Sequence, residues 1–543
     1  MLRLILAAVA AACSLTVLAD VCLAAPRPTA MRKVTLDIPG PPARVLPVDV
    51  NGDGRIDLVM ALAWSEFESV EFERLEGFVQ MTTIVPALFD RREIRVYLQQ
   101  PDGQYLLAGP ALMLPASVLA LDSGPGPTPV VALTDEGVAA LKLEGEAPYA
   151  ALTFSPLIAD PPVLAGAGTL MSSLRLRFDL DGDAHPDLMF PAEDGMALYR
   201  GGTDGPSPRS VTRLPLPDDR RGRDTAPWRR YSMPRLEDLD SDRLPDLFVV
   251  TGSDSNPIVH VFRGEGEGRF APARVLTPLC DMGQTGATGE HGGWGELAHF
   301  GDITGDGLAE VVTSTEKSGD DDGLDEAREP HFTYRFYHAR KDLTVDPKPY
   351  LEMEVLGHPF GAGVFSMMGG SPFVDLDHDG RKEILTITLD FSLWQAIRVL
   401  TTKRFGMGLD FQLWSQGAGG GFTKITGLDL SEKLLLDFND LKMPRFGHFS
   451  GDFNGDGIKD FVHLGRGKEV TIHYGKPGSH YPPKPDVTLD IGTEIQDVAL
   501  ARIADLDGDG RSDLSITRMI PSDEAGVTGR ARLELYLSSK AAP

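Results

Sequence analysis

Short apolar strands alternate with acidic, glycine-rich turns along almost the whole chain. The turns follow the pattern Asp-x-Asp/Asn/Thr-x-Asp-x-x-x-Asp/Glu, with oxygen-bearing side chains at positions one, three, five and nine and an apolar strand on each side. Intact copies begin at Asp49, Asp179, Asp238, Asp302, Asp375, Asp452 and Asp505. Such self-similarity indicates a repeat architecture, so the length of 543 residues is no argument for several separate domains.

An eighth unit has lost the acidic residues but has kept the strands. Asp122 is followed by Ser-Gly-Pro-Gly instead of alternating acids, and the apolar run 130–133 still follows at the expected place. Including this degenerate unit, consecutive units begin 53 to 77 residues apart. Because a propeller blade is a four-stranded sheet of about 40–50 residues, each unit has room for one blade plus an insertion. The pattern predicts an all-β propeller of eight blades, or of seven if the degenerate unit is not a blade.

A second pattern completes each unit. A strand that ends in an aromatic residue follows most acidic loops, as in 94–97, 259–262 and 533–536, and a glycine-rich turn such as 264–268 usually comes next. Glycine supplies the positive φ angles that tight hairpin turns need. Each unit is therefore interpreted as strand A, acidic loop, strand B, connection, strand C, glycine turn and strand D.

The two ends of the chain complement each other. The last unit ends without a D strand, whereas the segment 33–38 precedes the first A strand and closely matches the internal D strand 486–491. We predict that 33–38 pairs with the strand 533–537, so that the N-terminal strand completes the last blade. Closing the ring in this way removes exposed sheet edges, which otherwise invite aggregation.

The acidic loops have the chemistry of calcium sites. Calcium takes six to eight hard oxygen ligands, and acids at alternating positions let one tight loop aim several side chains at one ion. Position seven can add a backbone carbonyl, and the acid at position nine would close the cage. Glycine stands at position six in five loops, where an EF-hand also needs it, but an EF-hand closes with a glutamate at position twelve. The β-rich flanks and the acid at position nine indicate a hairpin calcium loop instead.

The sequence therefore predicts about seven calcium ions, one for each intact loop and none at Asp122. The predicted ligands are Asp49, Asn51, Asp53 and Asp57; Asp179, Asp181, Asp183 and Asp187; Asp238, Asp240, Asp242 and Asp246; Asp302, Asp306 and Glu310; Asp375, Asp377, Asp379 and Glu383; Asp452, Asn454, Asp456 and Asp460; and Asp505, Asp507, Asp509 and Asp513.

Three loops are expected to bind calcium more weakly. Ala184 and Arg243 stand at position six, where a left-handed backbone costs a non-glycine residue about 1–2 kcal/mol, and Thr304 replaces an acid. The alternative is that all seven loops are merely solvated acidic turns. Against it, the same four oxygen positions recur in fixed register seven times, and three or four unpaired carboxylates in one loop repel each other.

These motifs resemble the FG-GAP or VCBS repeats of integrin α-chain heads and of many bacterial surface proteins. The resemblance covers nearly the whole chain after its first residues, and the motif is specific for fold and calcium but not for a ligand. It implies that the loops carry structural calcium and that the propeller binds proteins or glycans.

The N-terminus has the features of an export signal. Arg3 precedes an apolar stretch over 4–18, and small residues follow at 22–24, so we expect a signal peptide over 1–24 and a single propeller domain over 25–543. Neither this stretch nor any later one has the length and apolarity of a membrane span. The expected location is secreted, periplasmic or at the cell surface of a bacterium. Cys280 would be the one remaining cysteine, so no internal disulfide forms, and metal would have to supply stability.

Charge and insertions limit the expected partners. The formal net charge is −27 and no basic cluster suits a phosphate backbone, so nucleic acid is not an expected partner. Insertions over 64–92 and 390–408 space their apolar residues like one face of a helix. They would either cap the propeller or dock a partner or membrane surface, on the face opposite the acidic loops.

The favoured function is a non-enzymatic binding or adhesion scaffold for a protein or glycan. Two alternatives remain open: a polysaccharide-degrading enzyme of the kind seen among lyases with eight-bladed propellers, and a structural component of an envelope complex. The sequence carries no nucleophile elbow, HExxH or phosphate loop, so no catalytic residue is predicted. Ligand identity and oligomeric state are not encoded in a recognisable motif.

Overall fold

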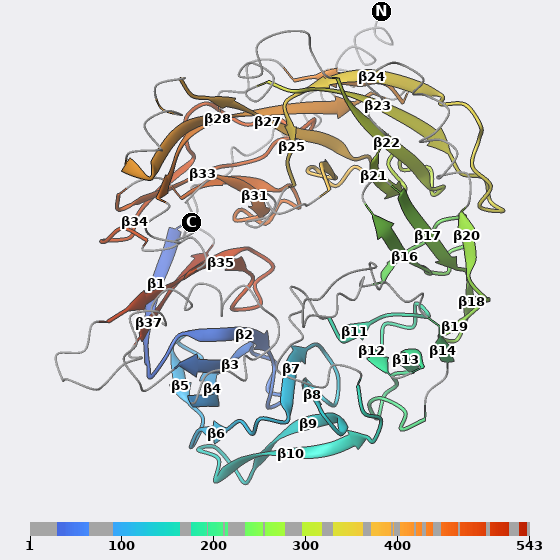
Figure 1. Ribbon diagram of the computed structural model, residues 1–543. Helices are drawn as coiled ribbons and strands as arrows, with labels where there is room; N and C mark the ends of the chain where they lie inside the picture. The colour runs from blue at the N-terminus through green and yellow to red at the C-terminus, as the bar shows by residue number, and fades with distance from the viewer. Residues whose placement is uncertain are drawn as a thin grey trace, which may run out of the picture.

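The computed structural model of the protein describes residues 30–64, 91–162, 175–192, 194–209, 212–215, 234–253, 256–276, 296–317, 329–361, 371–392, 395, 402–417, 420–425, 430–437, 447–464, 467–495, 500–520 and 531–539. Within these ranges the chain forms eight sheets arranged as blades around a central axis (Figure 1). The predicted eight-bladed, all-β propeller is confirmed. No helix in the described ranges has the length and apolarity needed to cross a membrane.

In the first four blades the strands run outward in chain order, from an inner strand A to an outer strand D. Blade 1 consists of β2 (Pro42–Val48), β3 (Asp57–Trp64), β4 (Arg91–Gln99), and the outer strands β5 (Tyr105–Leu107) and β6 (Leu112–Met113). Blade 2 consists of β7 (Val118–Ser123), β8 (Val130–Thr134), β9 (Gly137–Glu144) and β10 (Ala151–Ile158). Blade 3 consists of β11 (Arg177–Phe178), β12 (Asp187–Ala192), β13 (Gly195–Tyr199) and β14 (Thr212–Leu214). Blade 4 consists of β15 (Arg235–Glu237), β16 (Asp246–Ser253), β17 (Asn256–Phe262) and β20 (Arg274–Leu276), with the small hairpin β18 (Gly264–Gly266) and β19 (Arg269–Phe270).

The remaining four blades continue around the ring. Blade 5 consists of β21 (Glu296–Gly301), β22 (Glu310–Lys317), β23 (His331–His338) and β24 (Leu351–Leu356). Blade 6 consists of β25 (His358–Pro359), β26 (Phe373–Val374), β27 (Glu383–Asp390), β28 (Arg404–Gln416), β29 (Phe422–Lys424) and β30 (Ser431–Asp437). Blade 7 consists of β31 (His448–Gly451), β32 (Asp460–His463), β33 (Glu469–His473) and β34 (Val487–Asp490). Blade 8 consists of β35 (Ala501–Ala504), β36 (Asp513–Met519), β37 (Ala531–Ser539) and the N-terminal strand β1 (Ala30–Ile38).

The degenerate unit that begins at Asp122 forms a complete blade. The strands β7 to β10 pair in sequence as antiparallel neighbours, and Asp122 lies opposite Val131 in the first pair. The blade is kept because its apolar strand residues are intact: Val130, Ala132 and Leu141 belong to a core cluster shared with blade 1. Burial of apolar strands therefore specifies a blade even where the acidic loop has been lost.

The N-terminal strand closes the ring as predicted. Strand β1 pairs antiparallel with β37 along its whole length, with Lys33 opposite Tyr536 and Val34 opposite Leu535. The inward-facing Val34, Leu36 and Ile38 are buried against apolar residues of blades 8 and 1, including Leu58. Figure 1 shows this blue strand completing the red C-terminal blade.

Blade seams are filled by side chains from both neighbours. Between blades 6 and 7, for example, Phe411, Phe449 and Phe461 pack edge to face, with ring centroids 5.2 to 5.8 Å apart for the two pairs that include Phe411. Because each blade buries both of its faces in this way, the ring behaves as one packed unit and fixes the positions of the loops.

Blade 6 corrects one expectation about the connections and contains an additional strand. The C-terminal end of the insertion over 390–408, expected to be helical, is strand instead, since β28 begins at Arg404 and pairs with β27 so that Asp390 lies opposite Gly408. The segment that begins at Ser431 forms β30 and pairs with β28 over seven residues. Strand β28 is 13 residues long. Its N-terminal half, Arg404–Asp410, needs a hydrogen-bonded partner, and β30 provides it. The expected signal peptide over 1–24, most of the insertion over 64–92 and residues 396–401 lie outside the described residues.

Candidate metal-binding loops

The seven acidic loops share one backbone shape. Position four and position six both adopt a left-handed conformation in every intact loop; in the first loop φ is 76° at Gly52 and 84° at Gly54. The loops without glycine at position six keep this shape, with φ of 64° at Ala184 and 71° at Arg243. The requirement at position six was predicted, whereas that at position four was missed, although glycine stands at position four in five loops.

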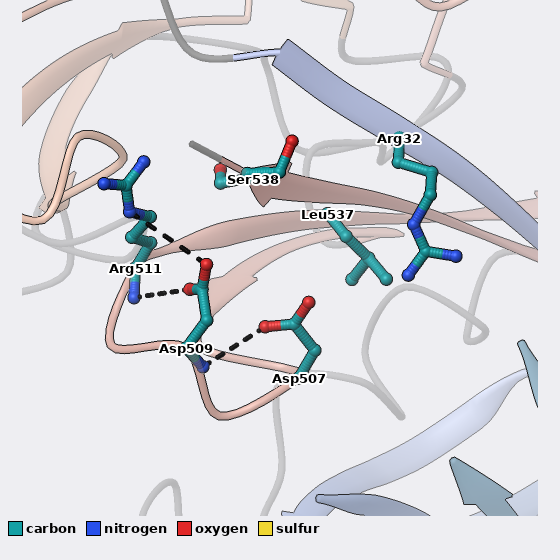
Figure 2. Close-up of a pocket in the computed structure, with 7 residues that line it drawn as sticks. Arg32, Asp507, Asp509, Arg511, Leu537 and Ser538 are labelled. Atoms are coloured by element: carbon teal, nitrogen blue, oxygen red, sulfur yellow. Dashed lines mark hydrogen bonds and ion pairs between the residues drawn. The ribbon is translucent and has the colours of Figure 1, made fainter. Parts of the chain in front are cut away.

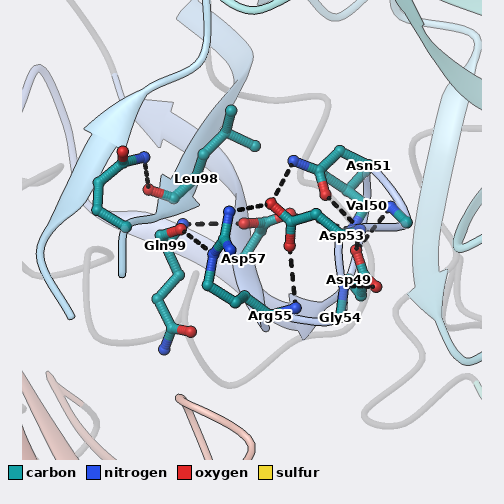
Figure 3. A network of polar contacts seen from close by, with 11 residues as sticks. Asp49, Val50, Asn51, Asp53, Gly54, Arg55, Asp57, Leu98 and Gln99 are labelled. Carbon is teal, nitrogen blue, oxygen red and sulfur yellow. Dashed lines mark hydrogen bonds and ion pairs between the residues drawn. The ribbon is translucent and has the colours of Figure 1, made fainter. Parts of the chain in front are cut away.

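The carboxylate at position one organises each loop. In the first loop, Asp49 Oδ1 accepts hydrogen bonds from the backbone N–H groups of Gly52 (2.7 Å) and Asp53 (3.1 Å), and Asp49 Oδ2 accepts one from Gly54 (2.8 Å; Figure 3). The two left-handed residues turn these N–H groups toward the carboxylate. These hydrogen bonds within the chain therefore curve the loop around its acidic side chains, and no ion is needed for that shape.

The acid at position nine ties each loop to the body of its blade. Asp57 is fully buried and accepts hydrogen bonds from Val50 N (3.1 Å) in its own loop and from Gln99 N (2.9 Å) at the end of strand C. The bond from position two recurs in all seven loops, at 2.7 to 3.1 Å. The bond from the end of strand C recurs at Asp187, Asp246, Asp460 and Asp513.

Burial strongly perturbs these position-nine acids. Desolvation raises the pKa of Asp57, Asp187 and Asp246 to about 6, that of Glu310 and Glu383 to about 7, and that of Asp460 and Asp513 to about 8. Backbone hydrogen bonds oppose this rise, and the neighbouring carboxylates of the same loop add to it. A cation in the loop would favour the ionised form, since an opposite charge nearby stabilises a carboxylate.

Four loops bring three carboxylates together. In each of these groups, one oxygen from every member lies within 4.8 Å of the others: Asp179, Asp181 and Asp187; Asp238, Asp240 and Asp246; Asp375, Asp377 and Glu383; and Asp505, Asp507 and Asp509. The first three groups leave out position five (Asp183, Asp242 and Asp379), and the fourth leaves out Asp513. The other three loops have no carboxylate at position three, where they carry Asn51, Thr304 and Asn454. Positions one, five and nine supply their carboxylates: Asp49, Asp53 and Asp57; Asp302, Asp306 and Glu310; and Asp452, Asp456 and Asp460.

Comparison with known proteins places two of these loops in a family. Residues 238–313, from position one of the blade 4 loop through the blade 5 loop, match a family described as an FG-GAP-like repeat. The chain is an eight-bladed β-propeller that contains an FG-GAP-like repeat over residues 238–313. No protein with a curated function matches the sequence.

Three solved structures are similar at low identity. A protein from Lactobacillus plantarum is 10% identical, with 72% of this chain and 84% of that chain covered and a TM-score of 0.29. A putative 6-phosphogluconolactonase from Bacteroides uniformis is 10% identical, with 80% and 97% covered and a TM-score of 0.30. An endo-arabinase from Bacteroides thetaiotaomicron is 13% identical, with 60% and 96% covered and a TM-score of 0.21. At these TM-scores no activity is transferred to this chain.

Two loops of the propeller carry an arginine that the sequence reasoning missed. Arg200 Nε lies 2.8 Å from Asp181 Oδ2, and Arg263 forms an ion pair with Asp240. Each arginine directly follows the aromatic residue that ends strand C, which is the sequence signal that could have revealed it. These are the two loops that lack glycine at position six, so an internal cation already partly neutralises two of the three loops expected to bind calcium more weakly.

In the degenerate blade 2 an arginine occupies the loop itself. The Arg177 guanidinium donates to the carbonyl oxygens of Pro125 (3.5 Å) and Thr128. Asp122 accepts hydrogen bonds from Leu176 N (2.8 Å) and Arg177 N (3.0 Å) of the next blade rather than curving its own loop. A protein cation therefore stands in this loop, and the absence of a bound ion there stays a prediction.

A polar cavity of about 390 Å³ lies beside the blade 8 loop, at the seam closed by β1 (Figure 2). Arg32 and Arg511 line it together with Asp507 and Asp509. Arg32 also donates two hydrogen bonds to Gly103 O, at 3.0 and 3.1 Å, and so links β1 to blade 1. The two arginines and two aspartates that line the cavity balance one another in charge. These residues already belong to the blade 8 loop or to the seam closed by β1.

The raised pKa values predict the pH dependence of the calcium-free protein. Since the folded-state pKa of the position-nine acids lies above the unfolded value near 4, their stabilising contribution is fully present below about pH 4 and is lost as pH rises through 6 to 8. Melting in chelator should therefore occur at lower temperature at pH 8 than at pH 5. Excess calcium should abolish this slope, and Asp460→Asn should reduce it. A calcium-free protein that becomes more stable from pH 5 to pH 8 would contradict the assignment.

Proposed function

We propose that this protein is an exported β-propeller that binds calcium through its acidic loops and serves as a non-enzymatic binding scaffold for a protein or glycan. One observation carries the calcium assignment. Four loops that share one backbone shape hold three carboxylate oxygens within 4.8 Å of one another, and three of these groups have at least one buried member. Close, buried like charges are costly without a cation, and carboxylate oxygens are the ligands that calcium prefers.

Positions one, three, five and nine would hold the ion. Calcium tolerates irregular coordination by six to eight oxygens, so an asparagine or threonine oxygen at position three can replace a carboxylate. When bound, the ion supplies a fixed positive charge that holds the loop to strands A and B. The residues themselves curve the loop, through position one, and anchor it to strand C, through position nine.

The binding role rests on the architecture. The ring is rigid because each blade buries both faces, and loops carried on a rigid scaffold are where recognition residues concentrate. The longest connections join strands B and C or lead from D to the next A, so they emerge on the face opposite the acidic loops. We assign ligand binding to that face, with calcium holding the scaffold from the other. The export assignment rests on the N-terminal sequence over 1–24.

Calcium stoichiometry tests the metal assignment. After gel filtration in trace calcium, elemental analysis of the mature protein should give about seven ions, one for each intact loop. Asp375→Asn combined with Asp377→Asn should remove one ion, whereas Asp122→Asn, in the degenerate loop, should remove none. Two ions or fewer at saturation would overturn the assignment.

Binding and export are tested together on protein made in a bacterial host. The chain should be recovered outside the cytoplasm with its N-terminus near residue 25, and a glycan array or a pull-down from envelope extracts should capture ligand in calcium but not in chelator. Polysaccharide cleavage by the purified protein would instead favour an enzyme. Retention of residues 1–24 in a cytoplasmic product would refute export.

A further inference from the structure

The blade 6 loop differs from the other acidic loops in leaving two buried carboxylate oxygens with neither a hydrogen bond nor an ion pair among the described residues. Asp181 Oδ2 and Asp240 Oδ2, in blades 3 and 4, also lack a hydrogen bond, but each is ion-paired with an arginine. Asp375 Oδ1 and Asp377 Oδ1 are both buried and have no hydrogen-bond partner among the described residues. The equivalent position-one oxygen in blade 7, Asp452 Oδ1, instead accepts a hydrogen bond from Gly455 N at 2.7 Å. A buried acceptor without a partner is destabilising, so two of them in one loop indicate a ligand.

A neighbouring blade reaches this loop. The Gly478 backbone N–H, in the turn between strands C and D of blade 7, donates to Asp377 Oδ2 at 2.6 Å across 101 residues of sequence. The same seam carries a second hydrogen bond, from Lys459 N to Leu376 O at 2.8 Å. In other loops the position-three oxygen accepts from its own loop, as Asn454 Oδ1 does from Asp456 N at 2.8 Å. The position-three acid of blade 6 is thus held from outside its own blade.

The same turn contains another unsatisfied oxygen. Ser479 follows Gly478, is fully buried, and its Oγ has no hydrogen-bond partner among the described residues. Both residues are left-handed, with φ of 77° at Gly478 and 56° at Ser479, a conformation that is sterically unfavourable for a serine. A strained turn that buries an unpaired hydroxyl beside an acidic loop is explained if a cation uses that hydroxyl.

We infer that the blade 6 loop is an inter-blade calcium site. Asp375, Asp377 and Glu383 hold the ion from blade 6, Gly478 positions Asp377 from blade 7, and Ser479 Oγ supplies a further oxygen ligand. This inference rests on the proposed calcium binding, and it adds that one of the ions fastens two blades together. Calcium is suited to such a site because it accepts neutral hydroxyl or carbonyl oxygens beside carboxylates.

Hydrogen exchange tests the link between the two blades. In the full-length mature protein, calcium should slow amide exchange in a peptide covering 474–482 by roughly tenfold, a change of about 1.4 kcal/mol in opening free energy. Asp375→Asn should abolish this effect, whereas the matched variant Asp179→Asn, at position one of the distant blade 3 loop, should retain it. Equal protection with and without calcium, or equal loss in both variants, would overturn the inference.

A calcium titration tests the hydroxyl ligand. Ser479→Ala should lower the affinity for one calcium ion by about tenfold and leave the affinities for the others unchanged. A tenfold loss is the lower end of the range for removing a group that supports a metal site. Ser207→Ala, in the corresponding turn of blade 3, is the control and should change none. If Ser479→Ala binds every ion as wild type does, the inter-blade site is refuted while the proposed function stands. Absence of calcium from the wild-type protein would instead refute both the inter-blade site and the proposed calcium binding.

Discussion

Removing calcium should lower the melting temperature of the mature protein by ~10–20 °C. Each ion that binds only the folded loop contributes about 2.7 kcal/mol when calcium exceeds its dissociation constant a hundredfold. About seven such ions act on a chain whose unfolding entropy is on the order of 1 kcal/mol per degree, from about 2.1 cal/mol/K per residue. The measurement is calorimetric melting in calcium and in chelator, with metal removal verified by elemental analysis.

The effect should depend on intact loops. A variant with asparagine at Asp179, Asp375 and Asp505 should melt at lower temperature in calcium and lose less on chelation, because three sites no longer contribute. The corresponding control is Asp122→Asn, which alters the loop occupied by Arg177 and should leave the calcium-dependent increment unchanged. A melting temperature that is the same with and without verified metal would show that calcium has no structural role.

Deleting the chain through Ile38 should leave little soluble, folded protein. The deletion removes all nine pairs of the β1–β37 register and the buried side chains of Val34, Leu36 and Ile38. Losing a single buried leucine or isoleucine side chain typically costs about 2–5 kcal/mol, and the exposed edge of β37 would then be open to pairing with other molecules. Deletion through residue 29 leaves β1 whole and is the control.

A matched pair of point variants tests whether the deletion acts by preventing ring closure or only by shortening the chain. Leu36 is buried in the seam between blades 8 and 1, whereas Thr35, its neighbour on the same strand, is exposed. Leu36→Arg should aggregate or melt far below wild type, and Thr35→Arg should behave like wild type, as measured by gel filtration and thermal melting. Similar behaviour of the two variants, together with similar behaviour of the two deletions, would mean that the ring does not depend on β1.

Much of the fold was predictable because its determinants are local. The alternation of apolar strands with acidic turns, repeated along the chain, gives the blades and their A–B loops, since each turn signal and each strand is contained in a few consecutive residues. Even closure was predictable, because the segment at Val34 repeats the internal D strand at Val487. The structure confirms that register and gives the degenerate unit at Asp122 a full blade.

The interactions inside the loops were only partly predictable. The spacing of the acids predicted which oxygens would face one ion, and the structure brings three carboxylates together in four loops. The spacing gave no sign that Arg177, Arg200 and Arg263 supply internal cations, since each enters its loop from another strand or another blade. Nor did it show that position nine anchors the loop to strand C, a contact that exists only once the blade has formed.

The sequence by itself thus determined the repeat, the strand order, the closing strand and the candidate ligands, because each is written in short, contiguous patterns. Only the tertiary structure decided which loops are complemented by arginine, how strands β28 and β30 extend blade 6, and that Gly478 reaches Asp377. The physical reason is that these contacts cross blade seams or span long stretches of chain. They depend on the distances that the closed ring imposes, and no local pattern of residues records those distances.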